Sequence, residues 1–203
     1  MAERSSQEAR NKASGQTVGQ ALKTQGVILV GLALVLWGVH LANVLLLGQL
    51  LRFGIMPRSL VGLRGIVLAP LLHGSFSHLA TNTVPLLTLG WLTLLRGMRT
   101  FWLTTAVVVL SAGLGTWLLG APTSIHVGAS GVVFGYFGFL LLQGYFERSV
   151  GAVALSLVVA VLYGSLLWGV VPGGIGISWE SHLFGFLGGA IAARLLSRPS
   201  VSG

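Results

Sequence analysis

Four polar side chains stand near the starts of apolar segments, and together they supply the groups that an acyl-transfer site needs. Ser130 and His182 each lie near the start of one such segment, and His78 and Asn82 lie near the start of a third. A hydroxyl beside an imidazole can act as a nucleophile that the imidazole deprotonates. Donors such as His78 and Asn82 can hold the negative oxygen that forms when the hydroxyl attacks a carbonyl.

Ser130 lies within a run of small residues, Gly128-Ala129-Ser130-Gly131. The first N–H groups of a helix are unpaired, and the helix dipole makes that end positive. The backbone N–H of Ser130 could therefore help to bind an oxyanion. Small residues also let membrane helices pack closely, so Ser130 on its own favours the packing interpretation.

His182 strengthens the catalytic interpretation, because an ionisable side chain inside an apolar segment is costly and usually functional. At about 100° per residue, His182 shares one stripe of its helix with Gly185 and Gly189. A second glycine stripe lies beside Ser130, at Gly131, Gly135 and Gly138. Two such stripes predict the close approach that a serine–histidine hydrogen bond of about 2.6–3.2 Å requires. The alternative is a buried histidine that bonds to a carbonyl, with glycines that serve packing only.

His78 and Asn82 are four residues apart and therefore share one helical face. Both donate hydrogen bonds without needing a charge, so they could bind an oxyanion together with the Ser130 N–H. Alternatively, His78 and Asn82 cap the helix or bond to the preceding loop. We expect His73 to have such a structural role. A metal site of His73, His78 and His182 would lack carboxylate and thiolate ligands, so we predict no metal and no cofactor.

Phe134 lies one turn after Ser130 on nearly the same helical face. Its ring could pack against His182 and orient the imidazole in place of an acidic residue, although ordinary core packing is equally consistent. We assign no catalytic role to His40 or His126.

The composition excludes several other kinds of site. The chain has four Glu, no Asp and no Cys, which excludes a Ser-His-Asp triad, a pair of aspartates, disulfides and thiolate ligands. No His-Glu-x-x-His sequence occurs, so the usual zinc protease signature is absent. Charged residues make up 8% of the chain and mean hydropathy is +0.87, whereas soluble domains carry about 25% charged residues. The sequence therefore predicts a membrane protein.

Six apolar segments fill most of the 203 residues, and each approaches the roughly 20 residues that cross a bilayer. They cover about residues 27–51, 71–95, 101–119, 128–146, 150–171 and 181 to 194–198. We predict an all-α, six-transmembrane-helix bundle at 26–198, with a mobile polar tail at 1–25 and a C-terminal tail at 199–203. Because successive spans alternate in direction, the starts of the second, fourth and sixth lie on one side.

The positive charges predict the orientation. Of the twelve Lys and Arg residues, nine lie on the side of the termini in this arrangement, and the other three lie in the first loop, at Arg52, Arg58 and Arg64. Cytoplasmic loops are enriched in Lys and Arg. Both termini of this multi-pass cell-membrane protein are therefore predicted to be cytoplasmic, with the candidate site open to the outside. The same distribution explains the net charge of +8 without a nucleic-acid partner.

These residues and their order resemble the rhomboid family of intramembrane serine proteases over about residues 51–196. The resemblance rests on the small residues around Ser130, on His182 with its glycines, on Gly54-Ile55-Met56-Pro57-Arg58-Ser59, and on Ala69-Pro70-Leu71-Leu72-His73-Gly74 leading to His78 and Asn82. It implies a six-helix fold in which Ser130 is the nucleophile and His182 the general base. It also implies that His78, Asn82 and the Ser130 N–H bind the oxyanion, and that five residues support the site: Gly128, Gly131, Phe134, Gly185 and Gly189.

The resemblance further implies transmembrane protein substrates, a first loop partly in the lipid bilayer, and a mobile cap at residues 172–180. Phe134 stands where many members have a tyrosine, and the Trp-Arg pair that many have in the first loop is absent. The oligomeric state stays open. Two alternatives remain: a non-catalytic rhomboid-like protein that binds membrane-protein clients, and a small channel or transporter that uses histidines as a relay.

Overall fold

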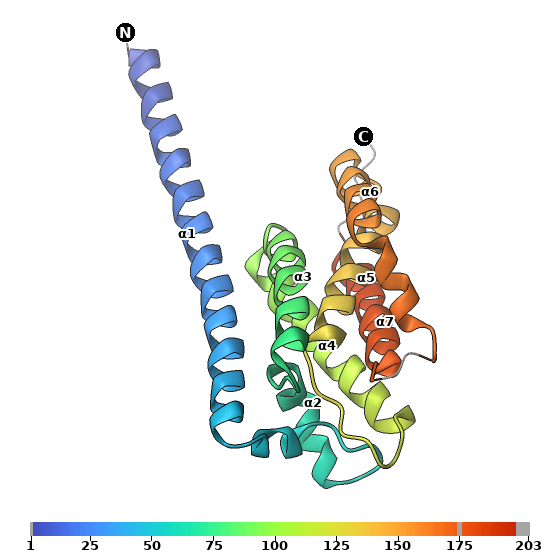
Figure 1. Cartoon of the computed structure of the whole chain (residues 1–203). Helices are drawn as coiled ribbons and strands as arrows, with labels where there is room; N and C mark the ends of the chain where they lie inside the picture. The colour runs from blue at the N-terminus through green and yellow to red at the C-terminus, as the bar shows by residue number, and fades with distance from the viewer. Residues whose placement is uncertain (1, 174–175, 198–203) are drawn as a thin grey trace.

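The chain folds into a bundle of helices (Figure 1). The computed structural model describes residues 2–173 and 176–197. Over these ranges there is no β-strand, and an isolated antiparallel bridge pairs Ile55 with His126. The prediction of an all-α membrane bundle is confirmed. Its physical reason is that backbone polar groups in lipid must be satisfied within the chain, which a helix achieves by itself.

The long helices are α1 (Ala2–Leu45), α3 (Phe76–Leu94), α4 (Met98–Leu119), α5 (Ser130–Glu147), α6 (Val150–Tyr163) and α7 (Trp179–Leu196). Short elements connect α1 to α3: the 3-10 helices η1 (Gln49–Phe53), η2 (Val61–Arg64) and η3 (Ala69–Leu71), and the one-turn helix α2 (Gly65–Leu68). A further 3-10 helix, η4 (Gly164–Val170), follows α6 directly.

Helix α1 is longer at its start, and shorter at its end, than the predicted first span. Residues 2–25, predicted to be a mobile tail, are helical and continuous with the apolar part, and Figure 1 shows this end of α1 extending beyond the rest of the bundle. The tail is rich in Ala, Glu, Gln, Lys and Arg, which are good helix formers. The helix ends at Leu45 instead of Leu51, because Leu47 and Gly48 adopt φ values of 52° and 82° and the N–H of Gly48 bonds to the carbonyl of Asn43 at 2.8 Å.

Within the described residues, three helical segments are long and apolar enough to cross a bilayer: Thr17–Leu45, Met98–Leu119 and Val150–Val170. The third consists of α6 continued by η4. The other predicted spans correspond to α3, α5 and α7, which carry the polar candidates and many glycines. Residues 131–140 of α5 are all buried. Protein therefore surrounds this part of the helix, which does not need the apolar outer surface of a helix that faces lipid. That these three helices also span the membrane stays a prediction.

Glycines set the contact between α5 and α7. A Cβ atom at Gly185 would overlap the carbonyl oxygen of Gly131, and a Cβ atom at Gly189 would overlap the carbonyl oxygen of Gly135. Backbone therefore packs against backbone, as small residues allow between membrane helices. This contact fixes the start of α7 relative to the start of α5.

The helices α3, α5 and α7 run in the same sense through the bundle. Their first turns meet at one cavity, which is lined by His78, Ser130 and His182 among others. The last residue of α7 and the ends of α3 and α5 meet at a polar pocket at the opposite end, lined by Leu95, Glu147 and Leu196 among others. The fold thus gathers the polar candidate residues at a single end.

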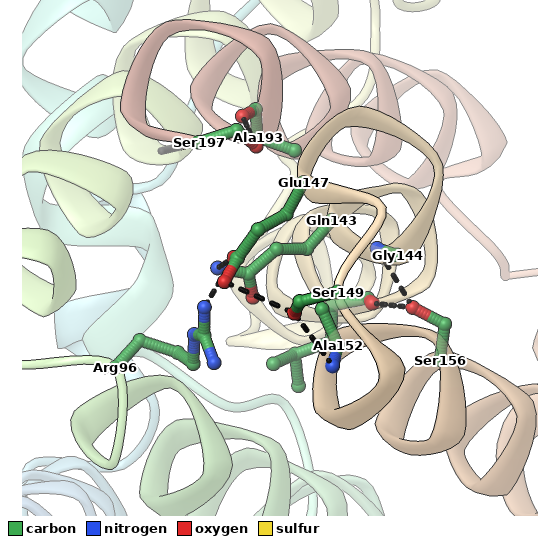
Figure 2. A network of polar contacts seen from close by, with 10 residues as sticks. Arg96, Gln143, Gly144, Glu147, Ser149, Ala152, Ser156, Ala193 and Ser197 are labelled. Atoms are coloured by element: carbon green, nitrogen blue, oxygen red, sulfur yellow. Dashed lines mark hydrogen bonds and ion pairs between the residues drawn. The ribbon is translucent and has the colours of Figure 1, made fainter. Parts of the chain in front are cut away.

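A network of polar contacts joins the helix ends opposite the cavity (Figure 2). Arg96, in the turn between α3 and α4, forms an ion pair with Glu147 at the end of α5. Glu147 also accepts hydrogen bonds from Gln143 at 3.2 Å and Ser149 at 3.3 Å. Ser149 in turn accepts from the N–H of Ala152 and so caps the start of α6. One carboxylate therefore ties three helix ends together.

The first loop, residues 52–69, contains η2 and α2 and is anchored to the end of α4. Arg58 donates hydrogen bonds to the carbonyls of Leu118 at 2.7 Å and Gly120 at 2.9 Å. The indole N–H of Trp117 donates to the carbonyl of Ser59 at 2.9 Å. The last carbonyls of a helix have no partner within it. Arg58 therefore provides hydrogen-bond donors for carbonyls at the end of α4 that would otherwise lack them.

Candidate active site

Ser130 and His182 lie within hydrogen-bond distance of each other. Ser130 Oγ is 2.8 Å from His182 Nε2. Ser130 is the first residue of α5 and His182 lies in the first turn of α7, so the glycine contact between these helices brings the two side chains together. His182 is buried, with 9% of its surface exposed. A hydroxyl and an imidazole in this geometry have the arrangement of a nucleophile and its general base.

The carbonyl oxygen of Gly169, in η4, orients the imidazole. It lies 2.9 Å from His182 Nδ1, and because a carbonyl can only accept, Nδ1 carries the proton of the neutral ring. Nε2 is then free to accept the proton of the Ser130 hydroxyl. In a triad an aspartate has this orienting role. The sequence did not identify Gly169, because a backbone carbonyl has no side-chain signature.

The ring of Phe134 stacks on His182, with the ring centroids 4.0 Å apart and the planes inclined by 5°. This holds the imidazole from one face, while Gly169 holds it at its edge. A Cβ atom on Gly169 would lie 2.6 Å from the Phe134 ring and 3.2 Å from His182 Nδ1. Glycine at position 169 therefore lets the carbonyl and the ring contact the imidazole together.

Two hydrogen bonds hold the chain just before Ser130. The N–H of Gly128 donates to the carbonyl of Ala69 at 2.9 Å, and the N–H of Ala129 donates to His73 Nε2 at 3.3 Å. Gly128 has a φ of 120°, which residues with a side chain rarely adopt. A Cβ atom there would also lie 2.7 Å from the imidazole of His78. These constraints present the Ser130 hydroxyl to the cavity.

His78 and Asn82 line the same cavity as Ser130 and His182. Asn82 is 7% exposed, and its Nδ2 has no hydrogen-bond partner among the residues that the structure describes. A buried donor without a partner is costly, so this amide suits a negatively charged oxygen in the cavity. The cap of α3 is Ser75, whose hydroxyl accepts from the N–H of His78 at 3.1 Å. Neither candidate side chain is therefore occupied in capping the helix.

The cavity has a volume of about 370 Å³. Residues of α3, α5 and η4 line it, together with Gly176, Ile177 and Ser178 of the segment before α7. The predicted cap at 172–180 ends earlier than expected, because Trp179 and Glu180 form the start of α7. Residues 174–175 of that cap lie outside the described residues.

The other histidines near the cavity contact protein groups. His40 Nδ1 lies 3.2 Å from the carbonyl oxygen of His73, and the His73 ring packs edge-on against His78 at 5.1 Å between centroids. Over residues 2–173 and 176–197, no three His, Cys, Asp or Glu side chains gather in a way that could hold a metal ion. The metal alternative considered for His73, His78 and His182 gains no support from this arrangement.

The chain is similar to known proteins over most of its length. The sequence model of a family described as "Rhomboid domain" matches residues 61–199. An uncharacterized protein of Mycobacterium tuberculosis is 45% identical over 157 residues, which are 72% of this chain and 64% of that protein. An uncharacterized protein of Mycobacterium leprae is 40% identical over 86% of this chain and 72% of its own length. A Bacillus subtilis protein named "Putative rhomboid protease YdcA" is 29% identical over 62% of this chain and 63% of its own length. The chain thus spans less than two thirds of the length of the M. tuberculosis relative.

Proposed function

Because the chain belongs to the rhomboid family, we propose that it is an intramembrane serine endopeptidase that hydrolyses peptide bonds in or near the transmembrane segments of other membrane proteins. The observation that carries this proposal is the 2.8 Å contact between Ser130 Oγ and His182 Nε2 in a cavity of about 370 Å³. No acidic side chain is needed, since Gly169 and Phe134 orient the imidazole.

In the proposed reaction, His182 Nε2 takes the proton of Ser130 as the hydroxyl oxygen attacks the carbonyl carbon of the substrate. The negative oxygen that forms is stabilised by the amide of Asn82, the imidazole of His78 and the N–H of Ser130 at the start of α5. His182 then gives its proton to the leaving amine, and an acyl-enzyme remains on Ser130. Water, deprotonated by the same imidazole, hydrolyses this ester and regenerates the hydroxyl.

The proposed substrates follow from the position of the site near the end of a bundle. A substrate helix hides its carbonyls in its own hydrogen bonds, so it must unwind before Ser130 can reach one. We therefore expect cleavage near Gly, Pro or polar residues in the outer part of a span. The family resemblance adds a preference for small residues before the cleaved bond.

We further propose a multi-pass cell-membrane protein whose termini are cytoplasmic and whose site opens to the outside. The basic residues at the end opposite the cavity support this orientation, since Lys and Arg favour the cytoplasmic side. The arginines at the cavity end have structural contacts. Arg58 bonds to the end of α4, and Arg52 and Arg64 lie 5.2 Å and 4.5 Å from the centre of the Phe53 ring.

The proposal is tested with purified protein in proteoliposomes that contain a model transmembrane substrate. We expect Ser130→Ala to reduce the cleavage rate by at least about 10³-fold, because the nucleophile is removed. Gel analysis of the released fragment measures the rate, and Ser77→Ala, on an exposed serine of α3, is the control. Cleavage by Ser130→Ala at the wild-type rate would contradict the serine mechanism. Absence of cleavage by the wild type and by both variants would favour a non-catalytic rhomboid-like protein.

A further inference from the structure

His126, which the proposed mechanism does not use, joins three segments of the chain around the candidate site. Its backbone pairs with that of Ile55 in the first loop, with N–H to carbonyl distances of 2.9 Å in both directions. Its imidazole Nε2 lies 2.6 Å from Ser124 Oγ, and its Nδ1 lies 2.7 Å from Ser178 Oγ. His126 stands four residues before Ser130, and Ser178 stands four residues before His182. The side chain of His126 thus connects the segment before Ser130 to the segment before His182.

The hydrogen bonds of His126 have a defined direction. The hydroxyl of Ser124 donates its one proton to the carbonyl of Ala121 at 2.6 Å, so it must accept from His126 Nε2–H. Burial lowers the pKa of His126, against an opposing effect of the Glu180 carboxylate. The ring is therefore mainly neutral at pH 7, and Nδ1 accepts the proton of the Ser178 hydroxyl.

Ser178 bonds to His126 and does not cap α7 with its side chain. It stands at the N-cap position of α7, where a serine hydroxyl normally accepts from an N–H of the first turn. No such side-chain bond is present at Ser178. By contrast, the N-cap serines of α3 and α6, Ser75 and Ser149, both make that bond. The hydroxyl that would cap α7 is used to hold α7 to the chain before Ser130.

Two described glycines of the segment before α7 have open space around them. Gly173 and Gly176 have φ values of 123° and 73°, and apart from the adjacent residues no atom lies within 4 Å of a Cβ built at either position. Ser178 is half-buried and lines the cavity, and its carbonyl accepts from the N–H of His182 at 3.2 Å. A shift of Ser178 would therefore move the first turn of α7 together with the imidazole.

We propose that His126 is a positioning residue: through Ser178 it holds the start of α7, and with it His182, in place relative to Ser130. This inference rests on the proposed proteolytic function. His126 does not line the cavity, so it acts on the reaction only through the residues that it holds.

The test uses the full chain in proteoliposomes with a transmembrane substrate, and compares kcat and KM of His126→Ala, Ser178→Ala and the double variant. We expect each single variant to lower kcat about 10- to 100-fold with KM nearly unchanged, because a misplacement of about 1 Å can cost about 10²-fold. The double variant should be no slower than the slower single variant, because both changes remove the same hydrogen bond. Ser124→Ala is the matched control, since it leaves the bond to Ser178 in place.

Two conservative variants separate positioning from general stability. In His126→Asn the side-chain oxygen can take the place of Nδ1 and accept from Ser178, so kcat should recover to within about threefold of wild type. In His126→Gln the amide takes the place of Nε2, and kcat should stay low. This comparison decides the question even if His126→Ala fails to fold.

Wild-type kcat in both His126→Gln and Ser178→Ala would overturn the inference, and so would losses that multiply in the double variant. A wild-type protein that neither cleaves the substrate nor reacts with a fluorophosphonate would instead refute the proposed function, and the inference with it. The two failures are therefore distinguishable.

Discussion

The candidate pair needs no acid because two neutral groups hold the imidazole of His182. The carbonyl of Gly169 fixes which nitrogen carries the proton, and the ring of Phe134 fixes the plane of the imidazole. Stacking of two rings contributes about 0.5–1.5 kcal/mol beyond the burial of their surface. The phenylalanine thus keeps the contact that a tyrosine would make, without its hydroxyl.

We expect Asn82→Ala to lower kcat about 10²- to 10³-fold, since the variant removes a donor that we propose binds the developing oxyanion. KM should change little, because the donor acts mainly in the transition state. Steady-state kinetics in proteoliposomes measures both constants. Asn43→Ala is the control: Asn43 is also a buried asparagine, but its side chain accepts from the N–H of Leu50 in η1. Equal kcat in Asn82→Ala and wild type would remove Asn82 from the mechanism.

Side chains with distinctive chemistry could be predicted from the sequence, and groups without it could not. The spacing around Ser130 and His182 predicted a close approach, and the structure has the two side chains 2.8 Å apart. Gly169 acts through its carbonyl, which every residue possesses, and therefore gives no signal. His126 gave the signal of an imidazole in a loop, but its partner Ser178 lies 52 positions away, and only the fold brings the two together.

Among the helices, the contact between α5 and α7 depends most on the absence of side chains. Gly185 faces the carbonyl of Gly131 and Gly189 faces the carbonyl of Gly135. Any Cβ atom at these positions would force the two helices apart. Since Ser130 and His182 stand on different helices, the distance between them depends on this contact.

We expect Gly185→Ala to destabilise the fold by about 1–3 kcal/mol through overpacking and to lower cleavage more than stability alone explains. Gly151→Ala is a matched control on α6, because nothing lies within 4 Å of a Cβ at that position. It should be neutral or slightly stabilising, since alanine is the better helix former. Thermal unfolding in detergent, followed by circular dichroism, compares the two. Equal unfolding midpoints would mean that α7 can shift without cost.

The approximate positions of the helices could be predicted from apolar runs, whereas several of their ends could not. The apolar pattern ends near residue 26, but α1 continues back to Ala2 because helix propensity does not require apolar residues. Near the C-terminal end of the chain, Trp179 and Glu180 were predicted to belong to the loop at 172–180, yet they start α7. Helix ends are set by caps and tertiary contacts, such as that of Ser178 with His126, which a hydropathy pattern does not contain.

The two ends of the bundle carry different sets of polar residues. The cavity end carries the candidate site, and the opposite end carries the network around Glu147 (Figure 2). Arg96 and Glu147 are both largely buried, with 27% and 15% of their side-chain surfaces exposed. A charge pair that is removed from water is costly to break on one side only. This network therefore holds the ends of α3, α5 and α6 without touching the cavity.

We expect Arg96→Met to lower the free energy of unfolding by about 1–3 kcal/mol, because Glu147 loses its charged partner. The kcat of the folded variant should stay within about threefold of wild type, since the cavity lies at the other end. Arg99→Met, at a neighbouring exposed arginine, is the control and should leave stability nearly unchanged. An unfolding midpoint of Arg96→Met equal to that of Arg99→Met would show that the ion pair contributes nothing.

The proposed activation of Ser130 by His182 can be measured without knowledge of the natural substrate. The protein in membranes is treated with a fluorophosphonate, which reacts with activated serines, and the modified residue is identified by mass spectrometry of its peptides. We predict an adduct on Ser130 in the wild type and a rate of labelling at least about 10³-fold lower in His182→Ala. Labelling of Ser130 at the same rate in both proteins, or labelling of a different serine, would contradict the proposed mechanism.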